Sequence, residues 1–153
     1  MQTAGASVAS APKAGWWVRF FAYFVDGLIV GIPAAIVGGI LAVLTGAFSA
    51  TENPNAGGVV LFYAIVVLAT VAYFVYFWSQ QDGQTIMNKA LGIKVVKTDG
   101  SPITVGTGIV RYIGYAINSI IFGLPIGFIW AAFDSQQQGW HDKIAGTYVI
   151  KTT

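Results

Sequence analysis

Two long apolar runs constrain the fold of this chain more than any other feature. Residues 20–44 contain a single charged residue, Asp26, and residues 59–78 contain none. Because a helix rises about 1.5 Å per residue, about 20 apolar residues cross the roughly 30 Å hydrocarbon core of a bilayer. The composition, 56% hydrophobic and 9% charged over 153 residues, also lacks the charged surface of a soluble domain. We therefore expect an all-α transmembrane protein with full membrane-spanning helices at about 18–45 and 59–79.

The first 16 residues are rich in Ala, Ser and Gly and have no apolar core of the signal-peptide type. We expect them to form a flexible tail, with residues 17–151 forming a single membrane domain. The chain contains no cysteine, so disulfides, thiolate nucleophiles and cysteine-bound metals are excluded.

The basic residues predict the orientation of the two helices. Lys13 and Arg19 flank the first apolar run, and several lysines follow the second one, whereas the intervening loop 47–58 has neither Lys nor Arg. Cytoplasmic loops carry an excess of Lys and Arg. We therefore expect the N-terminus and a loop at 80–104 to face the cytoplasm.

A third apolar region, at about 105–134, is interrupted by Gly and Pro at residues 123–127. Proline removes a helical hydrogen bond and clashes with the preceding turn, so we expect a broken helix here. Either the region crosses the membrane once, or it enters and returns as a re-entrant hairpin.

Two short segments favour the return. Residues 92–97 and 145–151 are rich in β-branched side chains, which is typical of strands. A lone strand is only marginally stable, so we expect the two to pair as a small cytoplasmic two-stranded element. Such pairing requires both segments to lie on one face of the membrane.

Several motifs resemble those of the RDD family of bacterial membrane proteins, which is named for one arginine and two aspartates. The motifs are Arg19–Asp26, Gly83–Thr85, Leu91–Val96, Arg111 and Gly139–Thr147. The resemblance implies that Arg19 and Asp26 are the arginine and the first aspartate, and that the second aspartate is Asp134 or Asp142. It also implies a multi-pass protein of the bacterial cytoplasmic (inner) membrane with a suspected role in transport.

Asp26 is the first candidate for a functional group, because a carboxylate near the bilayer centre costs several kcal/mol unless it is paired, solvated or used. Arg19 lies seven residues earlier on the same helix face, at about 10 Å along the axis. Asp26 could bind and release a proton or a small cation. The alternative is a structural interhelical hydrogen bond that holds the bundle together.

Polar residues of the third region are further candidates. Arg111 and Asn118 are also seven residues apart, and either could reach Asp26 in a bundle. Together with Arg19, Asp26 and Asp134 they form the predicted ion or proton site. If the third region instead lies at the membrane interface, Arg111 only contacts lipid headgroups.

His141 and Asp142 form a pair that we expect to be structural, tying the C-terminal strand to the cytoplasmic loop. A pH-sensing role for His141 is the alternative. One histidine with scattered carboxylates is a poor metal site, and no nucleophile elbow or phosphate-binding loop occurs. We therefore expect no cofactor, no metal and no enzymatic activity.

Two functions fit these observations. The first is transport of a small ion or solute, such as cation/proton exchange, through the Arg/Asp site. The second is a non-catalytic accessory or assembly subunit of a larger membrane complex. The expected partners are the lipid bilayer and either further copies of the chain or other membrane subunits, and a net charge of +2 gives no reason to expect nucleic acid.

Overall fold

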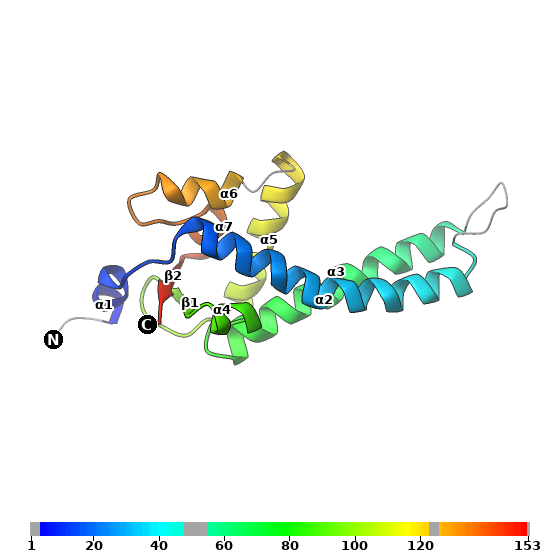
Figure 1. The fold of residues 1–153 in the computed structure, drawn as a ribbon, viewed down its shortest axis with the longest axis horizontal. Coiled ribbons are helices and arrows are strands. Elements are labelled where there is room, and N and C mark those ends of the chain that lie inside the picture. The colour runs from blue at the N-terminus through cyan, green and yellow to red at the C-terminus, as the bar shows by residue number, and fades with distance from the viewer. Residues whose placement is uncertain (1–3, 48–54, 123–125, 153) are drawn as a thin grey trace. The chain divides into compact units, whose positions relative to one another are not determined.

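The computed structural model describes residues 4–47, 55–122 and 126–152. Most of these residues are helical, and two short strands form one sheet (Figure 1). The elements in chain order are α1 (Ala4–Ser10), α2 (Trp16–Leu44), α3 (Ala56–Gln80), α4 (Ile86–Ala90), β1 (Ile93–Lys97), α5 (Val105–Phe122), α6 (Ile126–Ile129), the 3₁₀ helix η1 (Trp130–Ala132), α7 (Trp140–Ala145) and β2 (Thr147–Lys151).

The chain divides into two compact units. One unit contains Gly27–Tyr73, and the other contains Met1–Asp26 together with Phe74–Thr153. Helices α2 and α3 each contribute residues to both units. Both helices are long and apolar enough to cross a membrane, as the sequence predicts.

The unit of residues 27–73 is a helical hairpin. Its cyan and green helices lie side by side in Figure 1. Small residues allow this packing, since a Cβ atom at Gly38 would lie 3.2 Å from the Phe62 ring. The outer faces carry exposed apolar side chains such as Ile36, Leu44 and Leu68. A water-soluble hairpin would place polar residues there, so this surface suits a lipid environment.

The other unit contains the sheet, in which β1 pairs with β2 in antiparallel register, from Ile93 opposite Lys151 to Lys97 opposite Thr147. The predicted strand pairing is therefore confirmed, although the strand at 145–151 begins later, at Thr147. The pairing holds both ends of the intervening third apolar region at one sheet.

The N-terminal segment, expected to be a flexible tail, is partly ordered by contacts with β2. Residues 4–10 form α1. Further along, Ala14 N donates to the Val149 carbonyl at 2.9 Å and Lys151 N donates to the Pro12 carbonyl at 2.8 Å. The segment thus extends the sheet along the free edge of β2, where unpaired backbone groups favour such pairing.

Helix α5 ends at Phe122 and α6 begins at Ile126. Of the predicted breaker at 123–127, residues 123–125 lie outside the described residues, as does Glu52 of the loop between the first two long helices. Helix α5 packs against α7 so closely that a Cβ atom at Gly114 would lie 2.7 Å from the Cα atom of His141.

Helix α5 buries its large polar side chains and exposes large apolar ones. Arg111, Tyr115 and Asn118 are buried on one face. The opposite face exposes isoleucines, and Ile120 reaches 83% exposure. This distribution is the reverse of the one expected for a helix that packs on a soluble core.

A short helix, α4, interrupts the loop expected at 80–104. It begins at Ile86, and the preceding residue, Thr85, is the N-cap, whose hydroxyl accepts a hydrogen bond from Asn88 N at 3.2 Å. The turn before it requires glycine, because Gly83 has φ +75° and a Cβ atom there would lie 2.0 Å from the Val95 carbonyl oxygen. Helix α4 and β1 are thereby fixed next to the end of α3.

Candidate functional site

The first turns of α2 carry the two residues that begin the candidate site. Arg19, Ala22 and Asp26 are buried, at a spacing of three and four residues. This spacing places all three on one face of the helix. Both ionisable side chains therefore point into the protein.

The centre of the site is Asp142, on α7, which is fully buried. Arg19 Nη1 donates to Asp142 Oδ2 at 2.9 Å, and Arg111 Nη1 forms an ion pair with Oδ1. The backbone N–H of Gly139 donates to Oδ2 at 2.9 Å, which also closes the first turn of α7. One carboxylate thus joins α2, α5 and α7.

Arg111 makes further contacts that fix its guanidinium. Its Nη1 donates to Thr147 Oγ1 at 2.6 Å, and its Nη2 donates to the Tyr115 hydroxyl at 3.1 Å. The guanidinium also lies over the Trp78 ring, 5.1 Å from the centroid, in a cation–π contact. These contacts connect the ion cluster, formed by Arg19, Arg111 and Asp142, to the start of β2 and to the end of α3.

Electrostatics hold Asp142 ionised. Burial by itself would raise the pKa of its carboxyl, but the charges of Arg111 and Arg19 outweigh this and hold the pKa well below its usual range. Leaving either arginine without this carboxylate would strand a buried charge, which costs about 3–5 kcal/mol. Two guanidiniums and one carboxylate leave a formal charge of +1, so Asp26 is the nearest remaining counter-charge in the site.

Asp26 is held by the start of α4. The Thr85 hydroxyl donates to Asp26 Oδ2 at 2.5 Å, and Met87 N donates to Asp26 Oδ1 at 3.1 Å. Both donors belong to the first turn of α4, whose unpaired N–H groups favour an anionic acceptor. Asp26 therefore anchors this segment on α2, in addition to any role in ion binding.

His141 lies in an aromatic stack beside the ion cluster. Its ring centroid is 4.1 Å from that of Tyr115 and 4.6 Å from that of Phe128. Burial lowers the pKa of His141 to about 3, Asp142 opposes this shift, and the charges of Arg111 and Arg19 add to it. The imidazole is therefore neutral, and Nε2 lies 3.5 Å from Asp142 Oδ2.

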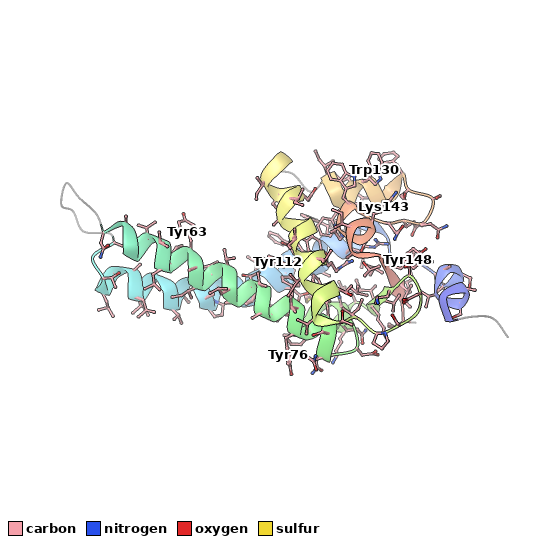
Figure 2. The ribbon with its side chains drawn as sticks, turned by 180° about the vertical axis from the view of Figure 1, so that it is seen from behind. Tyr63, Tyr76, Tyr112, Trp130, Lys143 and Tyr148 are labelled. Carbon is pink, nitrogen blue, oxygen red and sulfur yellow. The ribbon has the colours of Figure 1, made fainter. Side chains whose placement is uncertain are left out.

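Asn118 and Asp134, which the sequence placed in the same site, lie elsewhere. Asn118 Oδ1 accepts a hydrogen bond from Gly127 N at 2.6 Å, which fastens α6 to α5 across the break. Asp134 accepts from Gln138 N at 3.0 Å and pairs with Lys143, which Figure 2 labels on α7. The hydrogen bond from Lys143 lowers the pKa of the Asp134 carboxyl. Both residues organise local turns.

A small cavity lies between these groups. Its volume of about 20 Å³ corresponds to one water molecule. Among the residues that the structure describes, Arg19 Nη2 and Arg111 Nε have no hydrogen-bond acceptor. The polar and charged lining residues are Arg19, Tyr23, Asp26, Thr85, Asn88, Arg111 and Tyr115.

The expected contact between Asp26 and the third region is thus only partly present. Arg111 lines the same cavity as Asp26, but the side-chain bonds described above commit it to Asp142, Thr147 and Tyr115. Sequence reasoning missed the central position of Asp142. Each buried arginine needs a carboxylate partner, and this requirement could have pointed to Asp142 rather than to the partly exposed Asp134.

In residues 4–47, 55–122 and 126–152 no group of three or more His, Cys, Asp or Glu side chains is arranged to hold a metal ion. The donors at the cavity are guanidinium, hydroxyl and amide groups, with Asp26 as the one carboxylate. This set suits a proton, a water molecule or a small ion.

Comparison with known proteins gives a consistent result. The model of the RDD family matches residues 13–146. Three similar proteins come from Bacillus subtilis (strain 168): YxaI, 36% identical over 90% of this chain and 96% of its own length; YckC, 33% identical over 92% and 85%; and YteJ, 32% identical over 90% and 80%. The name of YteJ describes it as a membrane protein. No solved structure matches the chain.

Proposed function

Because this chain belongs to the RDD family, we propose that it is a small multi-pass membrane protein that moves a proton or another small ion through the site at Arg19 and Asp26. One observation carries the proposal. Arg19 and Asp26 of α2 and Arg111 of α5 line a single small cavity, and their side chains are buried.

The chemistry of the cavity supports an ion rather than a larger solute. Its volume of about 20 Å³ admits a water molecule or a monatomic ion. Asp26 is the proposed carrier, and Arg19 and Arg111 supply fixed positive charge beside it. Ionisable groups that are buried in a membrane protein commonly mark such paths.

The proposed topology has α2 and α3 crossing the bacterial cytoplasmic membrane. The N-terminus, the sheet and the C-terminal segment lie on the cytoplasmic side, because Lys13, Lys89, Lys143 and Lys151 gather in segments outside α2 and α3. The pairing of β1 with β2 supports this arrangement, since it keeps both ends of the intervening segment together.

In this arrangement α5, α6 and η1 enter the membrane from the cytoplasmic side and return. The exposed isoleucine face of α5 supports this, and so does Phe133, which is 84% exposed just after η1. Trp130, labelled in Figure 2, is also exposed and lies near Trp140, as expected for aromatic residues at a membrane interface.

Ion flux into proteoliposomes tests the transport proposal. We expect the natural chain to carry a current of protons or of another small ion, and we expect Asp26→Asn and Arg19→Gln to reduce it at least tenfold. Asp82→Asn is the matched control, because Asp82 is an exposed carboxylate that pairs with Lys94. Background flux in the natural chain and in every folded variant would refute transport.

Cysteine labelling tests the topology, since the chain contains no cysteine of its own. Single cysteines at Ser7, Thr98 and Thr152 should all react from the cytoplasmic side. Labelling of position 152 from the opposite side only would refute the proposed return of the third region.

A specific feature favours an accessory subunit as the second candidate. The hairpin of residues 27–73 has an apolar groove of about 440 Å³ between α2 and α3, lined by side chains that include Val37, Ile65 and Tyr73. A membrane helix of another subunit could lie there. This candidate predicts no flux from the isolated chain, and it predicts that Ala69→Trp, which fills the groove, prevents assembly with that subunit.

A further inference from the structure

Two buried guanidinium N–H groups at the cavity lack acceptors. Within the described part of the chain these are Arg19 Nη2 and Arg111 Nε, and both residues line the cavity. An unsatisfied buried donor is costly, and more so when it belongs to a charged group. The cavity is therefore suited to an occupant that accepts hydrogen bonds.

The other polar lining groups include further donors. Tyr23, Tyr115 and Asn88 offer hydroxyl or amide donors, whereas Asp26 is the one carboxylate in the lining. Both oxygens of Asp26 already accept hydrogen bonds from the start of α4. Two guanidiniums beside the cavity repel a cation, so the lining favours an anion.

The balance of charges at the cavity links binding of the anion to binding of a proton. Arg19 and Arg111 carry two positive charges, and Asp26 and Asp142 carry two negative charges when both are ionised. The other titratable lining groups, Tyr23 on α2 and Tyr115 on α5, are uncharged near neutral pH, as is His141 on α7, which stacks on Tyr115. Helix α4 and β1 contribute no charged residue to the lining. Uptake of a proton by Asp26 leaves a net charge of +1, which a bound anion would neutralise.

The size of the cavity limits the class of anion. A volume of about 20 Å³ accepts one particle about as large as a water molecule. Chloride and bromide are single atoms only somewhat larger than a water molecule, whereas phosphate, sulfate and carboxylates are much larger.

We propose that the cavity binds one halide ion, held by Arg19 and Arg111, and that the halide enters together with a proton on Asp26. This deepens the proposed function, on which it rests, by naming a co-substrate at the same site. The complex needs no covalent step, since the proton moves to a carboxylate oxygen and the halide is bound by hydrogen bonds and charge.

Halide binding can be measured on the purified chain in detergent, with sodium bromide against sodium gluconate at constant ionic strength. We expect bromide, but not gluconate, to raise the melting temperature of the natural chain, with apparent affinity increasing as the pH falls. Asp26→Asn mimics the protonated carboxyl, so it should bind bromide at least tenfold more tightly than the natural chain at pH 7. Asp82→Asn should match the natural chain.

A second measurement uses the natural chain alone and therefore does not depend on the folding of a variant. In weakly buffered solution, adding bromide should cause the uptake of up to one proton per bound ion, which a pH electrode detects. Asp26→Asn, where it folds, should bind bromide without this uptake.

The outcomes separate this inference from the transport proposal. Equal effects of bromide and gluconate, without proton uptake, would overturn the inference and indicate that the cavity holds water only. Bromide binding without linked proton uptake would also overturn it. Linked binding in detergent without any flux in proteoliposomes would uphold the halide site and refute transport.

Discussion

Replacing Asp142 by asparagine tests the central feature of the site. The side chain keeps its size, but it loses the charge that Arg19 and Arg111 share. Because both guanidiniums and the carboxylate are buried, the loss leaves uncompensated positive charge inside the protein. We estimate a loss of about 4 kcal/mol, within the range for breaking one buried ion pair.

This free energy converts to a large change in thermal stability. In a protein of this size each kcal/mol lowers the melting temperature by roughly 2–4 °C, so we expect a decrease of about 8–16 °C. Tryptophan fluorescence or circular dichroism in detergent can follow the transition.

The matched control is Asp82→Asn, which removes a carboxylate of 80% exposure from its pair with Lys94. Exposed pairs contribute about 0–1 kcal/mol, so the control should change the melting temperature by less than about 4 °C. A double variant, Arg19→Gln with Asp142→Asn, should lose less than the sum of the two single losses. Equal shifts for Asp142→Asn and Asp82→Asn, or strict additivity in the double variant, would refute the proposed network.

Three further predictions concern the surroundings of the site. The pKa of His141 in the folded chain is about 3, below its ordinary value of 6.5, so between these pH values the unfolded chain binds more protons and the free energy of unfolding should fall by about 1.4 kcal/mol per pH unit as the pH drops below 6.5. In equilibrium unfolding, His141→Gln should make stability less dependent on pH between pH 5 and 7. An unchanged slope would contradict a neutral buried imidazole. Gly139→Ala should lower the free energy of unfolding by about 2–4 kcal/mol, because its Cβ atom would lie 2.5 Å from the Gly127 carbonyl oxygen and 2.7 Å from His141 Cε1. At Gly31 an added Cβ atom would meet nothing within 4 Å, so Gly31→Ala should be neutral or slightly stabilising in the same unfolding assay. Thr85→Val should lower the free energy of unfolding by about 1–2 kcal/mol, since it removes both the N-cap of α4 and the hydroxyl donor to Asp26. Thr107→Val removes an exposed hydrogen bond and should lower it clearly less.

The sequence predicts the elements of this fold better than the side-chain partners within the site. Helices α2 and α3 follow from apolar length, and the pairing of β1 with β2 follows from two isolated strand patterns that need each other. These predictions rest on local periodicity and on backbone hydrogen bonding, which short windows of sequence contain.

The partners of the charged residues required information that local patterns lack. Arg19 shares the buried face of α2 with Asp26, yet it pairs with Asp142, which is 123 residues away. Arg111 likewise pairs with Asp142, and Asp26 turns to α4, a helix too short to produce a periodic signal. Helix α1 was missed for a similar reason, because seven small residues give no amphipathic pattern.

The separation of 123 residues between Arg19 and Asp142 has a consequence for how the protein is made. At synthesis rates of about 5–20 residues per second, Arg19 waits roughly 6–25 s before the ribosome adds its counter-ion. In the proposed topology, the first helix would enter the membrane during that interval before its guanidinium has the Asp142 carboxylate as a partner. Chains that end before Asp142 keep this exposed charge, so we expect membrane proteases to degrade them, while full-length chains escape once the carboxylate joins the two arginines.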